Sequence, residues 1–259
     1  MKPVFYILLI LAHFSYAFTQ CVTSPVKVDG FGSQFQILIY SVIYAELNHL
    51  NFAYTPFKTM EHNYNNDPLF LEKKESFIEF KDHFELNDGS AEPLDIWDVL
   101  VFINDNLDKC MNSQSMKKIK TIFRKNKRKS DYFDDSHFHI AIHIRRFNMH
   151  DSTFRGTDIP DSDYVHYIEQ LQFSYGAFNP IIHIFSQGDI RLFSQIYKGE
   201  NIVLHLNESV EDTFASFVFA DVLLISSSTL SYTAAFFSDG IVYFLPFWHP
   251  PLPSWKLMI

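Results

Sequence analysis

Short apolar runs alternate with amphipathic stretches through the second half of the chain. The runs are typical of buried strands, and they read FHIAIHI, IIHIF, NIVLHL, DVLLI and IVYFLP. Between them, the spacing of apolar positions predicts helices over SDYVHYIEQLQFSYG, a segment ending at Tyr197, SVEDTFASFVFA and STLSYTAAFFSDG. Continuous apolar strands separated by helices indicate a parallel sheet that is covered on both faces.

The first half is less regular. SPVKV and NFAYT predict short strands, and SQFQILIYSVIYAELNHL predicts a helix with Ser33 as its N-cap. PLDIWDVLVFINDNL predicts a helix with Pro93 in its first turn. Residues 61–92 give no clear pattern. The pattern predicts an α/β protein, and its length of 259 residues suits one large unit or two small domains that share a cleft.

A basic run changes the picture of one helix. From Lys117 to Lys129, eight of thirteen residues are lysine or arginine. At helical spacing these residues surround most of the helix, which favours a solvated helix, with an anionic membrane or an acidic partner as the alternative. The net charge of -9 argues against non-specific binding of nucleic acid, which needs a basic face.

The N-terminus is typical of a secretory signal. In residues 1–20 a lysine precedes an apolar run that ends near Ser15-Tyr16-Ala17, so we expect a cleaved signal peptide or an uncleaved anchor. Both place the protein in the lumen of the secretory pathway (endoplasmic reticulum or Golgi) or outside the cell, with no other membrane contact. Asn207 begins a glycosylation sequon. Cys21 and Cys110 could form a disulfide or remain as two thiols.

Polar residues follow the predicted strands, where parallel sheets bind ligands. Arg145 and Arg146 end one strand, and arginine forks bind phosphate oxygens in pairs, so they suit a diphosphate. The alternative is salt bridges to carboxylates of this chain. The segment 226–231, SSSTLS, joins a strand to a helix and favours phosphate contact over simple capping. The turn DGFGSQ lets backbone approach a ligand.

Two groups of residues are compatible with a metal site, and neither is the favoured interpretation. Asp161 and Asp163 form an Asp-x-Asp triplet, but they open a predicted helix, so capping is the favoured interpretation. His137, His139 and His143 share one strand face by their period of two, which makes a zinc site conceivable. No second ligand cluster accompanies them in the sequence, and we expect no metal or other cofactor.

These motifs together resemble the fucosyltransferase superfamily with a GT-B fold, particularly the α-1,2-fucosyltransferases of glycosyltransferase family 11. His143-Ile144-Arg145-Arg146 matches the H-x-R-R motif of that group, and ADVLLISSSTLSYTAA resembles its serine-rich block. Gly30-Phe31-Gly32-Ser33-Gln34 is similar to its opening G-x-x-N-Q turn. The anchors keep the family order over residues 28–245. The chain departs from the pattern at Asn148, where the family carries an acid, and at Ser33.

The resemblance implies two Rossmann-like halves: an N-terminal acceptor-side half over residues 21–136 and a C-terminal half over residues 137–259 that binds the GDP-sugar. It implies a metal-independent, inverting transfer of L-fucose from GDP-fucose to a glycan hydroxyl. The implied donor-binding residues are His143, Arg145, Arg146, Asp212, Ser227, Ser228 and Thr229. Arg145 and Arg146 would neutralise the leaving diphosphate, and Gly30, Gly32 and Gln34 would line the acceptor side. Asp29 is the first candidate for the base, with Asp151 and Asp158 as alternatives. The other interpretations are a catalytically silent sugar- or nucleotide-binding protein and a transferase using another nucleotide sugar.

Overall fold

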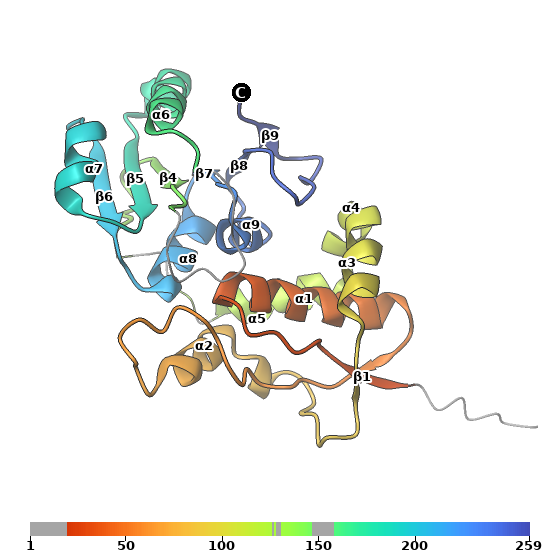
Figure 1. Ribbon diagram of the computed structural model, residues 1–259. Helices are drawn as coiled ribbons and strands as arrows, with labels where there is room; N and C mark the ends of the chain where they lie inside the picture. Colours follow the sequence, from red (N-terminus) through yellow and green to blue (C-terminus); the bar gives the residue numbers. More distant parts are fainter. Residues whose placement is uncertain (1–19, 126, 128–130, 147–157) are drawn as a thin grey trace, which may run out of the picture.

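The computed structural model describes residues 20–125, 127, 131–146 and 158–259 and contains two parallel sheets (Figure 1). A three-stranded sheet in the N-terminal half has the order β2-β1-β3. A six-stranded sheet in the C-terminal half has the order β6-β5-β4-β7-β8-β9. The expected α/β architecture with two parallel sheets is confirmed.

The six-stranded sheet is doubly wound. Its strands are β4 (His139–His143), β5 (Ile181–Ser186), β6 (Ile202–Leu206), β7 (Val222–Leu224), β8 (Ile241–Phe244) and β9 (Lys256–Leu257). Its helices are α6 (Asp161–Tyr175), η2 (Gly176–Phe178), α7 (Ile190–Ile196), α8 (Val210–Phe219) and α9 (Thr229–Ala235). Counted within this sheet, the spatial order is 3-2-1-4-5-6, so the direction of winding reverses between β4 and β7.

The two faces of this sheet belong to different cores. Ile140, Ile142 and Ile144 pack with residues of α6 and α7 in one buried cluster. Ala141 lies on the other face, in a second cluster that contains residues of α8, α9 and α1 (Phe31–Leu47). Figure 1 shows α6 on the outer side of the sheet, whereas α8 and α9 lie between the sheet and α1. The unbroken apolar pattern of β4 follows from this burial on both faces.

The N-terminal half has short strands and more loop. Its strands are β1 (Cys21–Thr23), β2 (Asn51–Phe52) and β3 (Glu92–Pro93). Its helices besides α1 are α2 (Phe70–Ile78), η1 (Phe80–Asp82), α3 (Ile96–Asp105), α4 (Leu107–Met111) and α5 (Gln114–Lys125). The prediction of a strand over SPVKV was wrong, because β1 ends at Thr23.

Two predicted helix starts also differ. Gly30, not Ser33, is the N-cap of α1, and the Ser33 hydroxyl instead accepts a hydrogen bond from Lys27 Nζ at 2.6 Å. Pro93 lies in β3, and α3 begins after Asp95, whose carboxylate accepts from the amides of Trp97 and Asp98. At α1 the Ser33 hydroxyl binds a lysine and the helix starts without a side-chain cap, and at α3 the Asp95 carboxylate supplies the cap.

The basic helix has a buried face. Four apolar side chains of α5 are buried in the core: Met116, Ile119, Ile122 and Phe123. The prediction of a helix charged around most of its circumference was therefore wrong, because the lysines leave one apolar stripe that packs inward.

One apolar core spans both halves. The ring of Phe35 on α1 stacks on Phe237 at 5.7 Å, and Phe31 contacts Phe214 of α8 at 5.9 Å. Gly32 lies at the same contact, since a Cβ there would be 2.5 Å from Leu230 Cα. The packing therefore crosses the expected boundary between residues 136 and 137.

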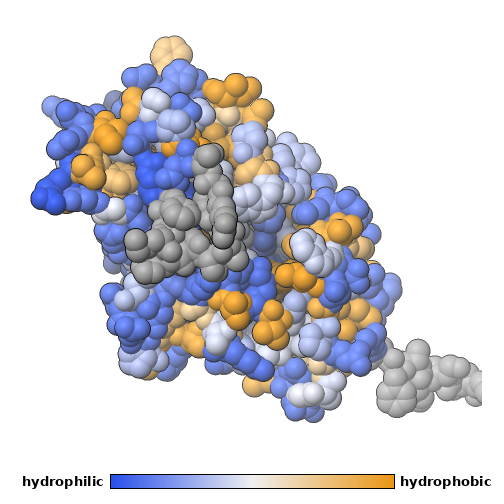
Figure 2. Space-filling model, viewed as in Figure 1, coloured by the Kyte–Doolittle hydropathy of each residue, from blue (hydrophilic) through white to orange (hydrophobic). Residues whose placement is uncertain are grey.

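Polar and apolar residues are interspersed on the face shown in Figure 2. Among the described residues, the helices are too short or too polar to cross a membrane. Residues 1–19 of the expected signal segment, residues 1–20, lie outside the described part of the chain, and so do Asn148 and Asp151. Cys21 and Cys110 are both free thiols, and burial raises the pKa of Cys110 to about 11.

Candidate functional site

Two loops meet where the winding of the six-stranded sheet reverses. His143 ends β4, and Ser226 follows β7, the neighbouring strand. His143 Nδ1 lies 3.0 Å from Ser226 Oγ and 2.9 Å from Ser231 Oγ on α9. These hydrogen bonds join the end of β4 to the start of α9. Ligands of doubly wound sheets bind at this reversal, outside the carboxyl ends of the strands.

His143 is held neutral. Burial, and secondarily the positive charge of Arg145, lowers the pKa of His143 to about 3. The ring is 7% exposed and packs beside Phe217 of α8. A neutral, buried imidazole contributes a directed hydrogen bond and no charge. His143 therefore fixes the geometry of the serine loop, and the cationic character of the site comes from elsewhere.

Arg145 and Arg146 have different surroundings. Arg146 forms an ion pair with Asp161 and lies 5.6 Å from the ring centre of Phe193 and 5.9 Å from that of Tyr164. It also donates to Tyr197 Oη at 3.3 Å. For Arg146 the structure thus shows the salt bridge that the sequence left open. Arg145 Nη1 donates to the carbonyl of Arg146 at 2.9 Å, and its charge acts on His143. Arg145 is accordingly the arginine associated with the reversal point.

Asp161 does not cap its helix. The N-cap of α6 is Pro160, without a side-chain cap, and the Asp161 carboxylate binds Arg146 and the hydroxyl of Tyr197. The prediction of capping by this residue was wrong because the carboxylate turns back toward β4 to neutralise a partly buried guanidinium. Burial raises the pKa of Tyr197, and the neighbouring Asp161 carboxylate raises it further.

The predicted serines divide into two sets. Ser228 is the N-cap of α9, where its hydroxyl accepts from Leu230 N at 3.3 Å, and Ser227 and Thr229 are partly exposed beside it. Ser226 and Ser231, which the sequence did not single out, are fully buried and hold His143. Their signal was present in the serine block, but only the histidine of another strand shows which hydroxyls point inward.

The glycine turn brings the N-terminal half to the same place. Gly32 packs against the backbone of Thr229 and Leu230, and its carbonyl accepts from Thr233 Oγ1 at 3.2 Å. Gln34 is buried and donates to the carbonyls of Asp29 and Thr59 at 2.6 and 2.9 Å. At Gly30 a Cβ would meet the ring of His62. The turn thus forms a close contact between the halves.

Asp29 stands at the start of this turn. Its Oδ2 pairs with Lys27 Nζ at 2.8 Å, and Oδ1 is buried without a hydrogen-bond partner in the described part of the chain. The alternative base Asp158 is exposed, just ahead of α6. Asp29 thus combines an ion pair at Oδ2 with a buried, unpartnered Oδ1.

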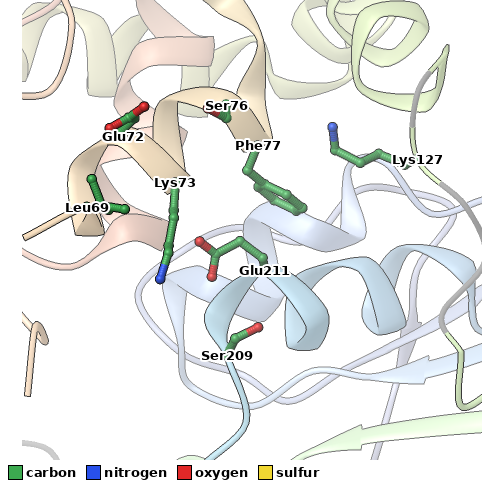
Figure 3. A pocket seen from close by; sticks show the side chains of 8 residues that line it. All are labelled: Leu69, Glu72, Lys73, Ser76, Phe77, Lys127, Ser209 and Glu211. Carbon is green, nitrogen blue, oxygen red and sulfur yellow. The ribbon is translucent and has the colours of Figure 1, made fainter. Parts of the chain in front are cut away.

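A groove lies between α2 and α8 (Figure 3). It has a volume of about 560 Å³ and is lined from the N-terminal half by Lys73, Ser76 and Phe77 and from the C-terminal half by Ser209 and Glu211. Because α8 follows β6, the groove opens at the carboxyl edge of the sheet. Asp212, the predicted guanine contact, is exposed in the first turn of α8, where its carboxylate accepts from Ser209 Oγ at 2.6 Å.

The three histidines of the conceivable zinc site do not converge. His137 binds Asp134, His139 binds His183, and His143 binds the two serines. Within the described ranges there is no group of three or more side chains that could hold a metal ion.

Comparisons with known proteins give distant structural similarity. No family model matches the chain, and no curated protein matches its sequence. Fucosyltransferase NodZ from Bradyrhizobium superposes with a TM-score of 0.45 at 11% identity, covering 83% of this chain and 92% of that chain. Heptosyltransferase WaaC from E. coli gives 0.45 at 11% identity and 93% coverage of both chains. A mutant of FUT1 from Arabidopsis thaliana with GDP gives 0.41 at 12%, covering 88% and 71%. These values describe a resemblance to glycosyltransferases that leaves donor and acceptor unassigned.

Proposed function

We propose that this chain is a glycosyltransferase that binds a nucleotide-diphosphate sugar where the six-stranded sheet reverses its winding. One observation carries the proposal: His143, Arg145 and the serine loop meet at that point, and the glycine turn of the other half packs against it. The sequence resemblance makes L-fucose from GDP-fucose the first candidate donor, transferred to a glycan hydroxyl in the secretory pathway.

In this proposal the charge of the leaving diphosphate is met by fixed groups. Arg145 supplies a permanent cation, and the partly exposed Ser227 and Thr229 of the serine loop supply hydroxyl donors. Arg146 acts indirectly, since its ion pair with Asp161 holds the end of β4 against α6. Preorganised donors stabilise negative charge that develops in the transition state without first having to reorient. No step of this scheme requires a metal ion.

The acceptor enters from the N-terminal half in the same proposal. Asp29, at the start of the glycine turn, is the proposed base, and its partly exposed carboxylate accepts the proton of the attacking hydroxyl. Gln34 positions Asp29 by binding its carbonyl. Attack from the side opposite the diphosphate inverts the anomeric centre. The groove between α2 and α8 has the size of a site for part of the sugar substrates.

The test measures GDP-fucose turnover on a glycan acceptor panel for the wild type, Arg145→Ala and Arg191→Ala. Arg191 is an exposed arginine paired with Asp189, and it serves as the matched control. We expect Arg145→Ala to lower turnover by about 100-fold, the size of one lost charge-stabilising contact, and Arg191→Ala to leave it unchanged. Equal turnover in all three proteins would remove Arg145 from the mechanism.

Two alternatives give different outcomes in a binding assay. A catalytically silent binding protein is stabilised by GDP in thermal unfolding but turns over no acceptor. A transferase that uses another donor is stabilised by a different nucleotide, such as ADP or UDP, and GDP does not compete with that nucleotide for binding. Stabilisation by a ligand follows its concentration and dissociation constant, so a titration ranks the nucleotides directly.

A further inference from the structure

A second cavity lies at the opposite edge of the six-stranded sheet. It has a volume of about 250 Å³, and its polar lining comes from Lys120, Ser238, Gly240, Ser254 and Lys256. Gly240 precedes β8, and Lys256 begins β9, so the cavity is at the amino ends of these parallel strands. His143 marks the carboxyl edge. Strands of four or five residues separate the two places by on the order of 15 Å.

Lys120 is the unusual residue of this cavity. It lies on α5 and is partly buried, yet it makes no hydrogen bond or ion pair in the part of the chain that the structure describes. Its neighbours on the helix are engaged: Lys118 donates to the His83 carbonyl, and Arg124 pairs with Asp239. Burial lowers the pKa of Lys120, Asp239 opposes this effect and Arg124 adds to it. A partly desolvated cation without a partner gains from an anion.

The remaining lining suits an anion with an apolar body. Trp255 and Phe236 add aromatic surface. The ammonium group of Lys256 lies over the ring of Tyr243 at 5.6 Å, so Lys120 supplies the charge of the cavity. Ser238 Oγ accepts from Gly240 N at 3.1 Å, so its hydroxyl hydrogen remains for an acceptor. A cation, a hydroxyl donor and aromatic rings together match a negatively charged group attached to a flat apolar group.

We propose that this cavity binds a small organic anion, a carboxylate or phosphate monoester that carries an aromatic or other flat apolar group. Its volume falls just under the usual range for small-molecule pockets, which limits the ligand to a compact molecule. The site is separate from the proposed nucleotide site. Because Lys120 belongs to the N-terminal half and the other lining residues to the C-terminal half, the ligand links the two halves.

Phenyl phosphate is the probe for this site. Its binding is measured by calorimetry and tryptophan fluorescence in an Arg145→Ala background, which lacks the cation of the proposed nucleotide site. We expect saturable binding with one site per chain and a change in the fluorescence of Trp255. Lys120→Met, which keeps the alkyl chain but removes the charge, should weaken binding about tenfold. Lys117→Met, at an exposed position of the same helix, should not change it.

Three results would overturn the proposal. They are the absence of saturable binding, equal affinities for Lys120→Met and Lys117→Met, and equal affinity for phenol, which lacks the charge. A further variant, Ser254→Trp, fills the cavity from an exposed position and should abolish binding even if Lys120→Met fails to fold. Undiminished binding by Ser254→Trp places the ligand elsewhere. Loss of GDP-fucose turnover with retained phenyl phosphate binding separates this site from the proposed transferase site.

Discussion

The two parallel sheets of the molecule differ in what they bury. The core around the three-stranded sheet is built from rings such as Phe35, Tyr54 and Phe80. The six-stranded sheet buries a row of imidazoles on the face toward that core. His139 Nδ1 lies 2.9 Å from His183 Nε2, and His183 Nδ1 lies 2.9 Å from His205 Nε2.

The histidine row has one consistent set of protons. His139 Nε2 lies 3.0 Å from the carbonyl of Asp134, which can only accept, so this nitrogen carries the proton. His183 and His205 must then donate from Nε2 to the next ring. A regular sheet can thus bury polar side chains when each one donates a hydrogen bond to the next. We therefore expect the six-stranded sheet to be the pH-sensitive part of the fold.

The largest expected effect is acid unfolding of the six-stranded half. Burial lowers the pKa of His183 and of His143 to about 3 and that of His249 to about 4, and it also lowers the pKa of His205. Above pH 6.5 these rings are neutral in both states. Below it the unfolded chain takes up protons that the folded chain refuses, so stability falls toward pH 3. Each ring contributes about 1.4 kcal/mol per pH unit.

Urea unfolding at a series of pH values measures this slope. His183→Gln should reduce it by about one proton, and His166→Gln, at an exposed position on α6, is the control. The groups around the row are Asp134, Glu208, Tyr132 and His137. The carboxylates of Asp134 and Glu208 raise the pKa values of His183 and His205 and so partly offset the lowering by burial. A slope that is the same in the wild type and His183→Gln contradicts a role for the row.

A smaller effect is expected at the contact between the halves. Lys74 on α2 is 3% exposed and pairs with Glu211 on α8 at 2.6 Å. Glu211→Ala leaves a buried ammonium group without its partner, and we expect a loss of about 3 kcal/mol in the free energy of unfolding. Chemical denaturation monitored by circular dichroism provides the measurement.

The adjacent lysine offers a matched control. Lys73 pairs with Asp67 at the same 2.6 Å, but its side chain is 57% exposed. We expect Asp67→Ala to cost less, because an exposed ion pair contributes little to stability. This holds although the variant also loses the hydrogen bond that Asp67 accepts from Leu69 N. The double variant Lys74→Met/Glu211→Leu should recover most of the stability. Equal losses for Glu211→Ala and Asp67→Ala would show that the pairing across the halves is no stronger than a surface pair.

The smallest effect is expected at a helix cap of the N-terminal half. Asp95 Oδ1 accepts from the amides of Trp97 and Asp98 at 2.8 and 3.1 Å. Asp95→Ala should cost about 1 kcal/mol, and Asp95→Ser should restore most of it. Thermal unfolding at pH 7 resolves this difference. No recovery in Asp95→Ser would mean that the charge of Asp95, and not the cap, holds the start of α3.

The sequence predicted the two sheets unequally. Strands β4 to β8 were recognisable because each one is a run of mostly apolar residues, and β4 and β7 are buried along their whole length. β1 and β2 contain three and two residues, too few for any period to appear, and the neighbouring SPVKV was the stronger local signal. β9 was missed for the same reason, since Lys256 and Leu257 are exposed and carry no pattern.

The candidate site was predictable as a location and less so in its contacts. The rule that ligands bind beyond strand ends selected the loops after β4 and β7, and these loops do meet. The separate environments of Arg145 and Arg146 depend on Asp161 and Tyr197, 15 and 51 residues from Arg146. Local sequence does not encode such pairings. From the sequence alone, helix capping is the simplest interpretation of Asp161, because its partner Arg146 is identified only by the fold.

The core shared between the halves restricts how this protein can change over evolution. Phe35 on α1 stacks on Phe237, and Gly32 admits the backbone of Leu230 at a distance that no side chain allows. A recombination event that exchanged either half alone would separate the rings from their partners. The two halves therefore depend on each other for packing and tolerate exchange only as a pair.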